Sequence, residues 1–343
     1  LSLFHQLKLP NQRYLKKSIF LAFLKILNYK FFMKLISIVF SFKNEEKNLT
    51  ELVTRTAKVF SDPNSHNYEL IFVNDNSDDN SEETLTLLQK NYPITIINTS
   101  RTFGRDPCIL AGFEHAKGDA VVYIDSDLQD PPELIKELVA EYEKGFDVVH
   151  TIRTKRLGET KIRLFMTYLG YKLINLFSDI PLPINSGDFK LISRVALNKI
   201  LKNSEFRPYI RGMSVWVGFK QSKIYYVREP RASGEQRLGG GSPTAGFVTG
   251  ITAYSLKPLY FGIILGFASI LISILLISHT LYAKFTNVAA LGSAGILILV
   301  SFFSGIILFT QGIIGIYLAR IFEQVRGRDR YVIKDIKEPK KNH

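Results

Sequence analysis

Two long uncharged apolar segments near the carboxyl end place the strongest constraint on this 343-residue chain. They lie within residues 258–282 and 289–319, and each is long enough to cross a lipid bilayer as a helix. Only a short link containing Lys284 separates them, and a hairpin buried in a soluble core is a poor alternative at this length. We therefore expect a two-helix transmembrane hairpin, residues 257–319, behind a domain that folds in water.

The residues that flank the hairpin predict which side of the membrane the rest of the chain occupies. A basic tail, residues 320–343, follows the second apolar segment, and an excess of Lys and Arg beside a span marks the cytoplasmic side. Two spans return the chain to the side it left, so we expect a multi-pass inner-membrane protein with the domain ahead of the hairpin and both termini in the cytoplasm. The single cysteine, Cys108, excludes an intrachain disulfide and a cysteine-rich zinc site.

Strand and helix patterns alternate in the first half of the chain. The strand-like segments are short, apolar and rich in β-branched residues, and the segments between them have helical periodicity. This alternation is typical of an α/β fold with a mainly parallel sheet and helices on both faces. The expected strands are residues 34–40, 68–73, 94–98, 120–124 and 147–151, and the expected helices are residues 49–60, 82–91 and 133–144, with a further helix beginning within residues 100–109.

The fourth expected strand ends in an acidic turn. The sequence VVYIDSDLQDPPE, residues 121–133, passes from an apolar run to Asp125 and Asp127 and then to Gln129. Open α/β sheets bind ligands at the carboxyl ends of their strands, and hard oxygen ligands of this kind suit Mg2+ or Mn2+ shared with substrate phosphates. The alternative for an Asp-x-Asp pattern by itself is a helix start preceded by a solvated acidic turn.

A second polar turn follows the second expected strand. In VNDNSDDNS, residues 73–81, Asp75 falls at the strand tip, where a carboxylate can accept a hydrogen bond from a nucleotide base or a ribose hydroxyl. The alternative is an ordinary turn, which Asn, Asp and Ser form readily. The two strand tips together are more informative than either alone.

Charge and amphipathicity indicate a polyanionic partner. The formal net charge is +13, which is typical of proteins that meet nucleic acid, an anionic membrane face or a phosphorylated substrate. No nucleic-acid-binding motif accompanies the charge, so we expect no nucleic acid. A basic run from Arg153 leads into an amphipathic segment, residues 163–177, that is typical of an interfacial helix, with an ordinary core helix as the alternative. Residues 1–32 are expected to be a poorly ordered extension or a helix on the membrane surface.

An ordered set of motifs runs from about Met33 to the second apolar segment. The motifs are IVFSFKNEEKN, ELIFVNDNSDDNS, SRTFGRDPCILAGFEHAKGD, YIDSDLQDPPE and NSGDFKLISR. The set resembles glycosyltransferase family 2, and more narrowly the polyprenyl-phosphate glycosyltransferases, which include dolichyl-phosphate mannosyltransferases and bactoprenol glucosyl transferases. The resemblance implies a Rossmann-like catalytic domain of the GT-A type over residues 33–230 and a juxtamembrane segment over residues 231–256. It also implies a nucleotide-sugar donor, a Mg2+ or Mn2+ ion and inversion at the anomeric carbon.

The family's motifs, matched position by position, imply roles for individual residues. Those at the nucleotide sugar would be Glu45, Asp75, Arg101 and Asp125. Those in contact with the metal would be Asp125, Asp127 and Gln129. Those of the catalytic and acceptor side would be Asp127, Asp188, Arg153, Arg163 and Arg231. The arginines would hold phosphates of the lipid acceptor or the donor, although Arg156 competes with Arg163, and each arginine alone is equally compatible with a solvated surface charge.

Two departures from the family pattern stand out. The family usually has a pair of aspartates in the second motif, whereas here Asn74 precedes Asp75. The segment RASGEQRLGGGSPTAG, residues 231–246, also differs from the usual Gly-Glu-Thr/Ser-Lys-Tyr pattern, although Glu235 fits. Within it, Gly239–Gly241 are expected to form a flexible lid segment or a linker before the membrane helices.

The reaction implied is inverting transfer of a hexose to polyprenyl (undecaprenyl) phosphate at the cytoplasmic membrane face, with glucose from UDP-glucose favoured. Two alternatives stay open: a processive membrane polysaccharide synthase, and a membrane-anchored nucleotide-sugar-binding protein that has lost catalysis. A processive synthase usually carries a Gln-x-x-Arg-Trp pattern, and the only tryptophan, Trp216, lacks Gln and Arg at that spacing. Glycines permit close helix approach, and self-association through the spans is a further expectation from Gly262, Gly266, Gly305 and Gly312.

Overall fold

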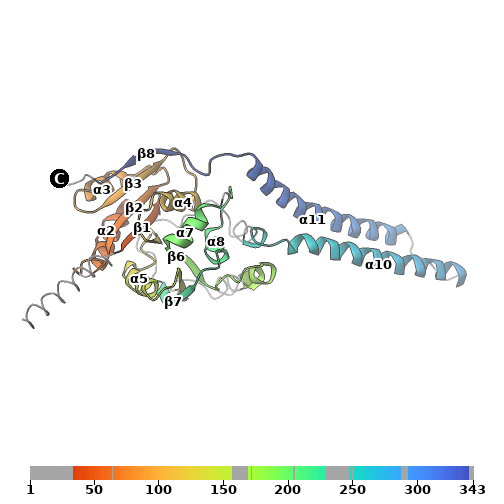
Figure 1. Cartoon of the computed structure of the whole chain (residues 1–343). Coiled ribbons are helices and arrows are strands. Elements are labelled where there is room, and N and C mark those ends of the chain that lie inside the picture. Colours follow the sequence, from red (N-terminus) through yellow and green to blue (C-terminus); the bar gives the residue numbers. More distant parts are fainter. Residues whose placement is uncertain are drawn as a thin grey trace, which may run out of the picture.

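The computed structural model describes residues 34–63, 65–156, 169–170, 172–203, 205–228, 248, 250–286 and 293–339. Several sequence predictions lie outside these described residues: the amino-terminal extension, Arg163, Arg231 and Gly239–Gly241. The described residues form a sheet with helices on both faces and a long pair of helices that extends away from the sheet (Figure 1).

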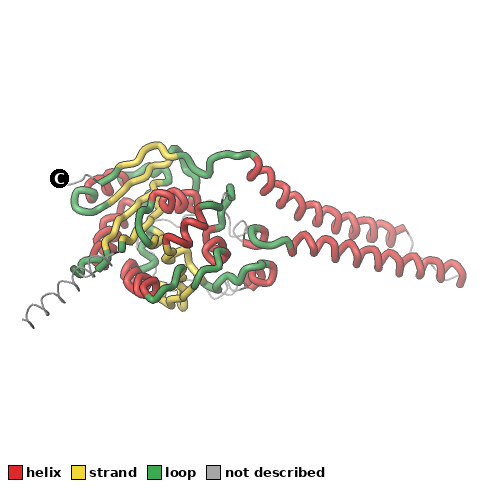
Figure 2. The backbone as a smooth tube through the Cα atoms, viewed as in Figure 1, coloured by secondary structure: helices red, strands yellow, loops and turns green. Residues whose placement is uncertain are grey.

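An eight-stranded sheet forms the domain in front of the hairpin, in the order β7-β5-β6-β4-β1-β2-β3-β8. The strands are β1 (Leu35–Phe42), β2 (Asn67–Asn74), β3 (Ile94–Thr99), β4 (Ala120–Asp125), β5 (Val148–Arg156), β6 (Ser186–Ser193), β7 (Gln221–Arg228) and β8 (Ile333–Lys337). Strands β1 to β4 run parallel, β5 and β7 are parallel to each other, and β6 and β8 join by antiparallel pairing. The predicted mainly parallel sheet is therefore confirmed, and Figure 2 shows its strands in yellow.

Helices cover both faces of the sheet, and each face has its own apolar core. The helices of this domain are α2 (Glu46–Val59), α3 (Ser81–Leu88), α4 (Arg105–His115), α5 (Ile135–Glu143), α7 (Arg194–Leu201) and α8 (Ile210–Trp216), with a short 3-10 helix, η1 (Pro132–Leu134), ahead of α5. Helices α2, α3 and α5 pack on one face, and α4, α7 and α8 pack on the other. Cys108 is buried in the second of these cores.

The central strands are apolar along most of their length because both of their faces are covered. In β1, Ile38 and Phe40 belong to the core under α2, whereas Val39 belongs to the core under α4. Such continuous burial is typical of parallel strands between two helix layers. Charged groups of these strands consequently gather at the strand ends, where the candidate site lies.

Strand β5 is longer than the sequence indicates. The apolar pattern predicts an end at Thr151 and a basic run beyond it, but β5 continues to Arg156 and pairs with β7 along this stretch. Arg153 can lie within the sheet because the buried carboxylate of Asp130 accepts a hydrogen bond from its guanidinium group. A pattern of apolar residues cannot indicate a strand position that is stabilised in this way.

Gly112 allows α4 to lie close to β1. A Cβ atom at this position would stand 2.3 Å from Val39 Cγ1 and 3.2 Å from Val73 Cγ2, and both valines are fully buried. Helix α4 begins at Arg105. Because Arg105 and Gly112 lie on the same helix, the close contact at Gly112 also determines the position of Arg105.

Two long apolar helices follow the sheet domain: α10 (Lys257–Thr286) and α11 (Ser293–Val325). They lie side by side and extend away from the sheet (Figure 1). Their apolar windows have mean hydropathies of 2.6 and 2.2, and no residue of either window is buried within the chain. Apolar surface on this scale is unstable in water and suits the hydrocarbon of a bilayer. The two helices therefore indicate membrane association, and each is long enough to span a membrane.

Polar contacts join the base of the hairpin to the sheet domain. Tyr317 donates to the carbonyl oxygen of Ser255 over 2.6 Å, and Arg207 pairs with Glu323 at 2.5 Å. After α11 the chain returns to the sheet as β8. The sequence pattern predicts only a basic tail in this region. Both ends of the hairpin are thus attached to the sheet domain.

Gly112→Ala should lower the free energy of unfolding by about 1–3 kcal/mol, because the added methyl group overpacks the contact with Val39. Thermal unfolding of the detergent-solubilised protein, followed by circular dichroism, measures the effect. Val39→Ala removes the atoms that clash, so it should reduce the cost of Gly112→Ala in the double variant. An unchanged melting temperature for Gly112→Ala would contradict the close packing of α4 on β1.

Candidate active site

The acidic turn after β4 and the polar turn after β2 lie at the same edge of the sheet. Asp125 of β4 lies opposite Ser41 of β1, and Asn74 of β2 lies opposite Phe42 on the other side of β1. The two strand tips are therefore two strand spacings apart, roughly 10 Å. The strand order reverses between β1 and β4, which makes this edge the topological switch point where open α/β sheets bind ligands.

Packing holds the acidic turn in shape. Leu128 has a φ of 57°, a left-handed conformation that costs a non-glycine residue about 1–2 kcal/mol, and its side chain is buried in the core on the α5 side. Ser126 Oγ donates to the carbonyl oxygen of Ser41 over 3.0 Å, and the Gln129 N–H donates to Asp127 Oδ1 over 3.2 Å. The buried side chain of Leu128 therefore anchors the turn, and the turn holds Asp127 at the end of the strand.

Asp125 and Asp127 are neighbouring carboxylates that repel each other. The Tyr123 hydroxyl donates to Asp125 Oδ1 over 2.5 Å. Burial, and after it the charge of Asp125, raises the pKa of Asp127 to about 6. Arg228 opposes this shift from a distance of 3.9 Å. A divalent cation at this position would stabilise both carboxylates.

The arrangement fits a metal that is shared with a substrate. No cluster of three or more His, Cys, Asp or Glu side chains that could hold a metal ion occurs among the described residues. Mg2+ does not require such a cluster, because it usually binds one or two carboxylates and takes its other ligands from water and substrate phosphates. The pair of Asp125 and Asp127 fits this mode, and the predicted third contact, Gln129, is half-buried beside them.

Asp130 joins two arginines and was not among the residues predicted from the sequence. Its side chain is fully buried, and it accepts hydrogen bonds from Arg153 Nη2 at 3.2 Å, from Arg228 Nε at 3.0 Å and from the Tyr226 hydroxyl. A buried charge is stable when it is paired and hydrogen-bonded, and three donors satisfy this one. Its place in the acidic turn was the only sign in the sequence that Asp130 belongs to the site. A sequence does not show whether an acid in such a turn is buried or solvated.

Arg153, one of the predicted phosphate-binding arginines, lies against β6. Its Nε donates to the Tyr226 hydroxyl over 3.0 Å. A Cβ atom at Gly187 would stand 2.9 Å from Arg153 Nη2, so the guanidinium group needs a glycine at this position of β6. Because Asp188 is the next residue along β6, the NSGD motif serves two parts of the site: it makes room for Arg153 and supplies a carboxylate.

Asp188 is 5% exposed and is held by two arginines. Arg105 Nη1 lies 2.7 Å from Asp188 Oδ2, and Arg211 donates to the carboxylate from Nε at 3.1 Å and from Nη2 at 2.6 Å. Burial alone would raise the pKa of Asp188, but the charges of Arg105 and Arg211 outweigh burial and hold that pKa well below its usual range. The two arginines therefore favour the ionised form of Asp188 at neutral pH.

Neither arginine at Asp188 was predicted as a site residue. Arg105 lies within the third motif of the sequence, so its position offered a signal. Arg211 lies on α8, where no motif surrounds it, and only the fold brings it to β6.

Asp75 folds the loop that follows β3. Its carboxylate accepts the backbone N–H groups of Phe103 at 2.7 Å and Gly104 at 3.1 Å, and its own N–H donates to the carbonyl oxygen of Phe42. Gly104 has a φ of 97°, which a glycine adopts at little cost. The observed role of Asp75 is thus to close the loop of residues 99–104, and its contact with a nucleotide stays a prediction.

The two other residues predicted at the nucleotide sugar lie near strand ends. Glu45 is buried ahead of α2, and its Oε2 accepts from Asn48 Nδ2 over 2.6 Å. Arg101 is exposed, and its guanidinium group lies over the ring of Phe103 at 4.0 Å. Arg101 and Phe103 together offer a flat surface of the kind that stacks on a nucleotide base.

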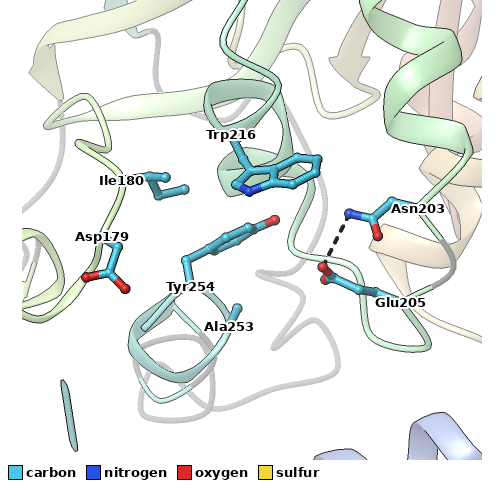
Figure 3. Close-up of a pocket in the computed structure, with 7 residues that line it drawn as sticks. All are labelled: Asp179, Ile180, Asn203, Glu205, Trp216, Ala253 and Tyr254. Atoms are coloured by element: carbon cyan, nitrogen blue, oxygen red, sulfur yellow. Dashed lines mark hydrogen bonds between the residues drawn. The ribbon is translucent and has the colours of Figure 1, made fainter. Parts of the chain in front are cut away.

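A cavity of about 510 Å³ lies at the base of the hairpin (Figure 3). Its lining residues are Asp179, Ile180, Asn203, Glu205, Trp216, Ala253 and Tyr254, and none of them was predicted as a site residue. Helix α8 connects this cavity to the acidic site, because Arg211 near its start reaches Asp188 while Trp216 at its end lines the cavity.

Comparison with known proteins identifies the family. Residues 37–201 match the model of glycosyl transferase family 2. The uncharacterised glycosyltransferase YkcC of Bacillus subtilis is 39% identical over 87% of this chain and 93% of its own length. A prophage bactoprenol glucosyl transferase homologue of Escherichia coli is 31% identical over 88% of this chain and 99% of its own length. A crystal structure of glucosyl-3-phosphoglycerate synthase from Mycobacterium tuberculosis, in complex with Mn2+, uridine diphosphate and phosphoglyceric acid, covers 59% of this chain and 72% of its own, with 16% identity and a TM-score of 0.44.

The chain belongs to glycosyl transferase family 2. It is a glycosyltransferase, and its sheet domain has the GT-A type of fold. The family and the fold class expected from the sequence are confirmed. Similarity at this level does not assign roles to single residues, which rest on the geometry of the site.

Asp188→Asn should lower kcat/KM at least about tenfold, because the loss of charge releases Arg105 and Arg211 from their ion pairs. The activity profile between about pH 6 and pH 9 should keep its shape, because Asp188 is ionised throughout that range. Steady-state rates in detergent, with the exposed Glu137→Gln as the control variant, measure both effects. Disappearance of an acidic limb in Asp188→Asn would show instead that Asp188 titrates during catalysis.

Proposed function

We propose that the protein transfers glucose from a nucleotide sugar, with UDP-glucose favoured, to polyprenyl phosphate at the cytoplasmic face of the membrane. The observation that carries the proposal is the similarity to bactoprenol glucosyl transferases, at 31–32% identity over 87–88% of this chain. A similarity of that length includes the apolar hairpin as well as the sheet domain. A lipid acceptor explains why a glycosyltransferase carries such a hairpin.

The donor is expected at the switch point, between the tips of β2 and β4. Arg101 and Phe103 would stack on the base, in the loop that Asp75 holds. The residues that would hold a cation on the donor diphosphate are Asp125, Asp127 and Gln129. When bound there, Mg2+ or Mn2+ would act as a Lewis acid that neutralises the departing nucleoside diphosphate.

Arginines provide the positive charge for phosphate groups on the other side of the acidic turn. Arg228 lies 3.0 Å from Asp130 and 3.9 Å from Asp127, and Arg153 shares Asp130 with it. Because the buried carboxylate already orders both guanidinium groups, they lose little freedom when they bind a phosphate. We infer that these two arginines hold phosphate oxygens of the acceptor or the donor.

The proposed reaction needs no general base. A phosphate monoester already carries about −1.5 to −2 charges near neutral pH, so its oxygen can attack the anomeric carbon directly. One displacement forms the sugar–phosphate bond, breaks the bond to the nucleoside diphosphate and inverts the anomeric carbon. Asp188, ionised and paired with Arg105 and Arg211, fits an orienting role on the acceptor side.

The hairpin would bring the site to the acceptor. A polyprenyl chain stays in the bilayer, so transfer has to take place at the membrane surface. Arginines after the apolar part of α11 support a cytoplasmic position of the sheet domain by the positive-inside rule: Arg320, Arg326, Arg328 and Arg330. The net charge of +13 would also favour contact with anionic lipid and with the lipid phosphate.

Incorporation of labelled sugar into lipid tests the proposal. Membranes containing the protein are incubated with polyprenyl phosphate and one labelled nucleotide sugar at a time, and the label is measured in the organic extract. We expect label from UDP-glucose, in a product that carries a single sugar with inverted configuration. Long polymer would favour a processive synthase, and no incorporation with any donor would favour a binding protein without catalysis.

Asp127→Ala should abolish transfer while the protein still inserts into membranes, because the cation would lose its principal carboxylate. The Glu137→Ala variant, which removes an exposed acid from α5, should transfer sugar at the wild-type rate. Membrane fractionation together with the labelled-lipid assay separates loss of chemistry from loss of insertion. An active Asp127→Ala enzyme would remove the argument for a metal at this turn.

A further inference from the structure

The carboxyl-terminal strand returns from the hairpin to the nucleotide side of the sheet. β8 lies beside β3 (Figure 1) and pairs antiparallel with it, and Asp335 lies opposite Asn98. The contact continues beyond the strand, because the N–H of Ser100 donates to the carbonyl oxygen of Val332 over 2.9 Å. Since β3 leads directly into the loop of residues 99–104, the tail lies against the strand that carries this loop.

Asn98 stands at the centre of a chain of hydrogen bonds. Its Nδ2 group donates to Asp335 Oδ1 at 2.8 Å and to Glu82 Oε1 at 2.9 Å, so carboxylates use both of its protons. Ionised carboxylates can only accept, and this determines which way the amide of Asn98 points. Its Oδ1 therefore has to accept, and it does so from Asn74 Nδ2 at 3.0 Å.

The amide of Asn98 in turn orients the amide of Asn74. Because Asn74 Nδ2 is used by Asn98, Asn74 Oδ1 faces the turn after β2 and accepts the N–H of Ser77 at 2.9 Å. This turn contains Asp75, whose carboxylate accepts the N–H of Phe103 and so closes the loop. A continuous relay thus runs from the tail strand to the turn that shapes the expected nucleotide site. Asn74 and Asn98 are each 4% exposed, so water has little access to replace these bonds.

We propose that Asp335 is a positioning residue for the nucleotide sugar, acting through Asn98 and Asn74 on the turn that carries Asp75. The inference rests on the proposed function, since it requires the donor to bind beside the loop of residues 99–104. Any strand could close the open edge of β3. The relay, in contrast, uses a hydrogen-bond acceptor at position 335, which acts together with Glu82 on the amide of Asn98.

The same relay accounts for the asparagine that precedes Asp75. An aspartate at position 74 would direct a carboxylate at Asn98 Oδ1, and two acceptors in contact repel each other. If the Asn98 amide turned over to relieve this, its oxygen would face Glu82 and Asp335. The two carboxylates on the far side of Asn98 therefore select an amide at position 74.

UDP binding and the KM for the nucleotide sugar test the relay in the full-length, detergent-solubilised protein. Asp335→Ala should raise the Kd for UDP and the donor KM by roughly three- to tenfold, with kcat and the acceptor KM within about twofold. Asp335→Asn keeps an acceptor oxygen and should behave as the wild type. Lys334→Ala removes an exposed neighbour on the same strand and is the matched control, which should leave every value unchanged.

A reciprocal exchange tests the direction of the relay. Asn74→Asp should weaken UDP binding at least about tenfold, because it places two acceptors in contact. Adding Asp335→Asn together with Glu82→Gln should restore most of the affinity, because both carboxylates that face Asn98 are then replaced by amides. In that triple variant the Asn98 amide can turn over, donate to the new carboxylate at position 74 and accept from the new amides at positions 82 and 335.

Equal UDP affinity in the wild type and in Asp335→Ala would overturn the proposal. A fall in kcat or in melting temperature with an unchanged donor KM would do the same, because it would assign Asp335 a purely structural role. The wild-type protein must bind UDP, or the nucleoside diphosphate of a donor found in the labelled-lipid screen. If it binds none of these, the proposed function is wrong, and the proposed role of Asp335 fails with it. If Asn74→Asp does not fold, the comparison of Asp335→Ala with Asp335→Asn and Lys334→Ala decides the question.

Discussion

Two buried carboxylates, Asp130 and Asp188, hold the arginines of the active site, and the rest of the site depends on them. Each pairs with two guanidinium groups and is at most 5% exposed. Buried charges of one sign would be unstable, but charges paired in this way are satisfied and rigid. Arginines from α4, β5, α8 and β7 are thereby ordered by buried partners, which is the preorganisation that the proposed transfer to a lipid phosphate would require.

The apolar hairpin is inserted into the sheet domain and does not simply follow it. The chain leaves the domain at Lys257, passes through α10 and α11, and returns to pair with β3 as β8. The ion pair of Arg207 with Glu323 attaches the base of α11 to the sheet domain as well. In a bilayer, attachment at both ends would restrict how far the switch point can turn relative to the membrane surface. Strand β8 and the two apolar helices are therefore joined in one continuous stretch of chain that begins and ends at the sheet domain.

The site residues at the strand tips could be predicted from the sequence, whereas two arginines of the site could not. Asp75, Asp125 and Asp127 were predicted because an apolar strand followed by a polar turn is a local pattern, and the structure brings these turns to one edge of the sheet. Arg211 and Arg228 were missed because their significance comes from distant partners. Arg228 is 98 residues from Asp130, and Arg211 is 23 residues from Asp188. A solvated arginine and a buried, paired one look the same in a sequence.

The sequence by itself determined the alternation of strands and helices, the apolar hairpin, the family and the acidic strand tips. These features depend on local periodicity, on segment length and on the order of motifs, and all three can be read directly from the sequence. Only the tertiary structure decided that the tail completes the sheet, that β5 continues through Arg153, and that Asp188 is paired with Arg105 and Arg211. These features depend on burial and on contacts between residues far apart in the chain, and no local pattern encodes either.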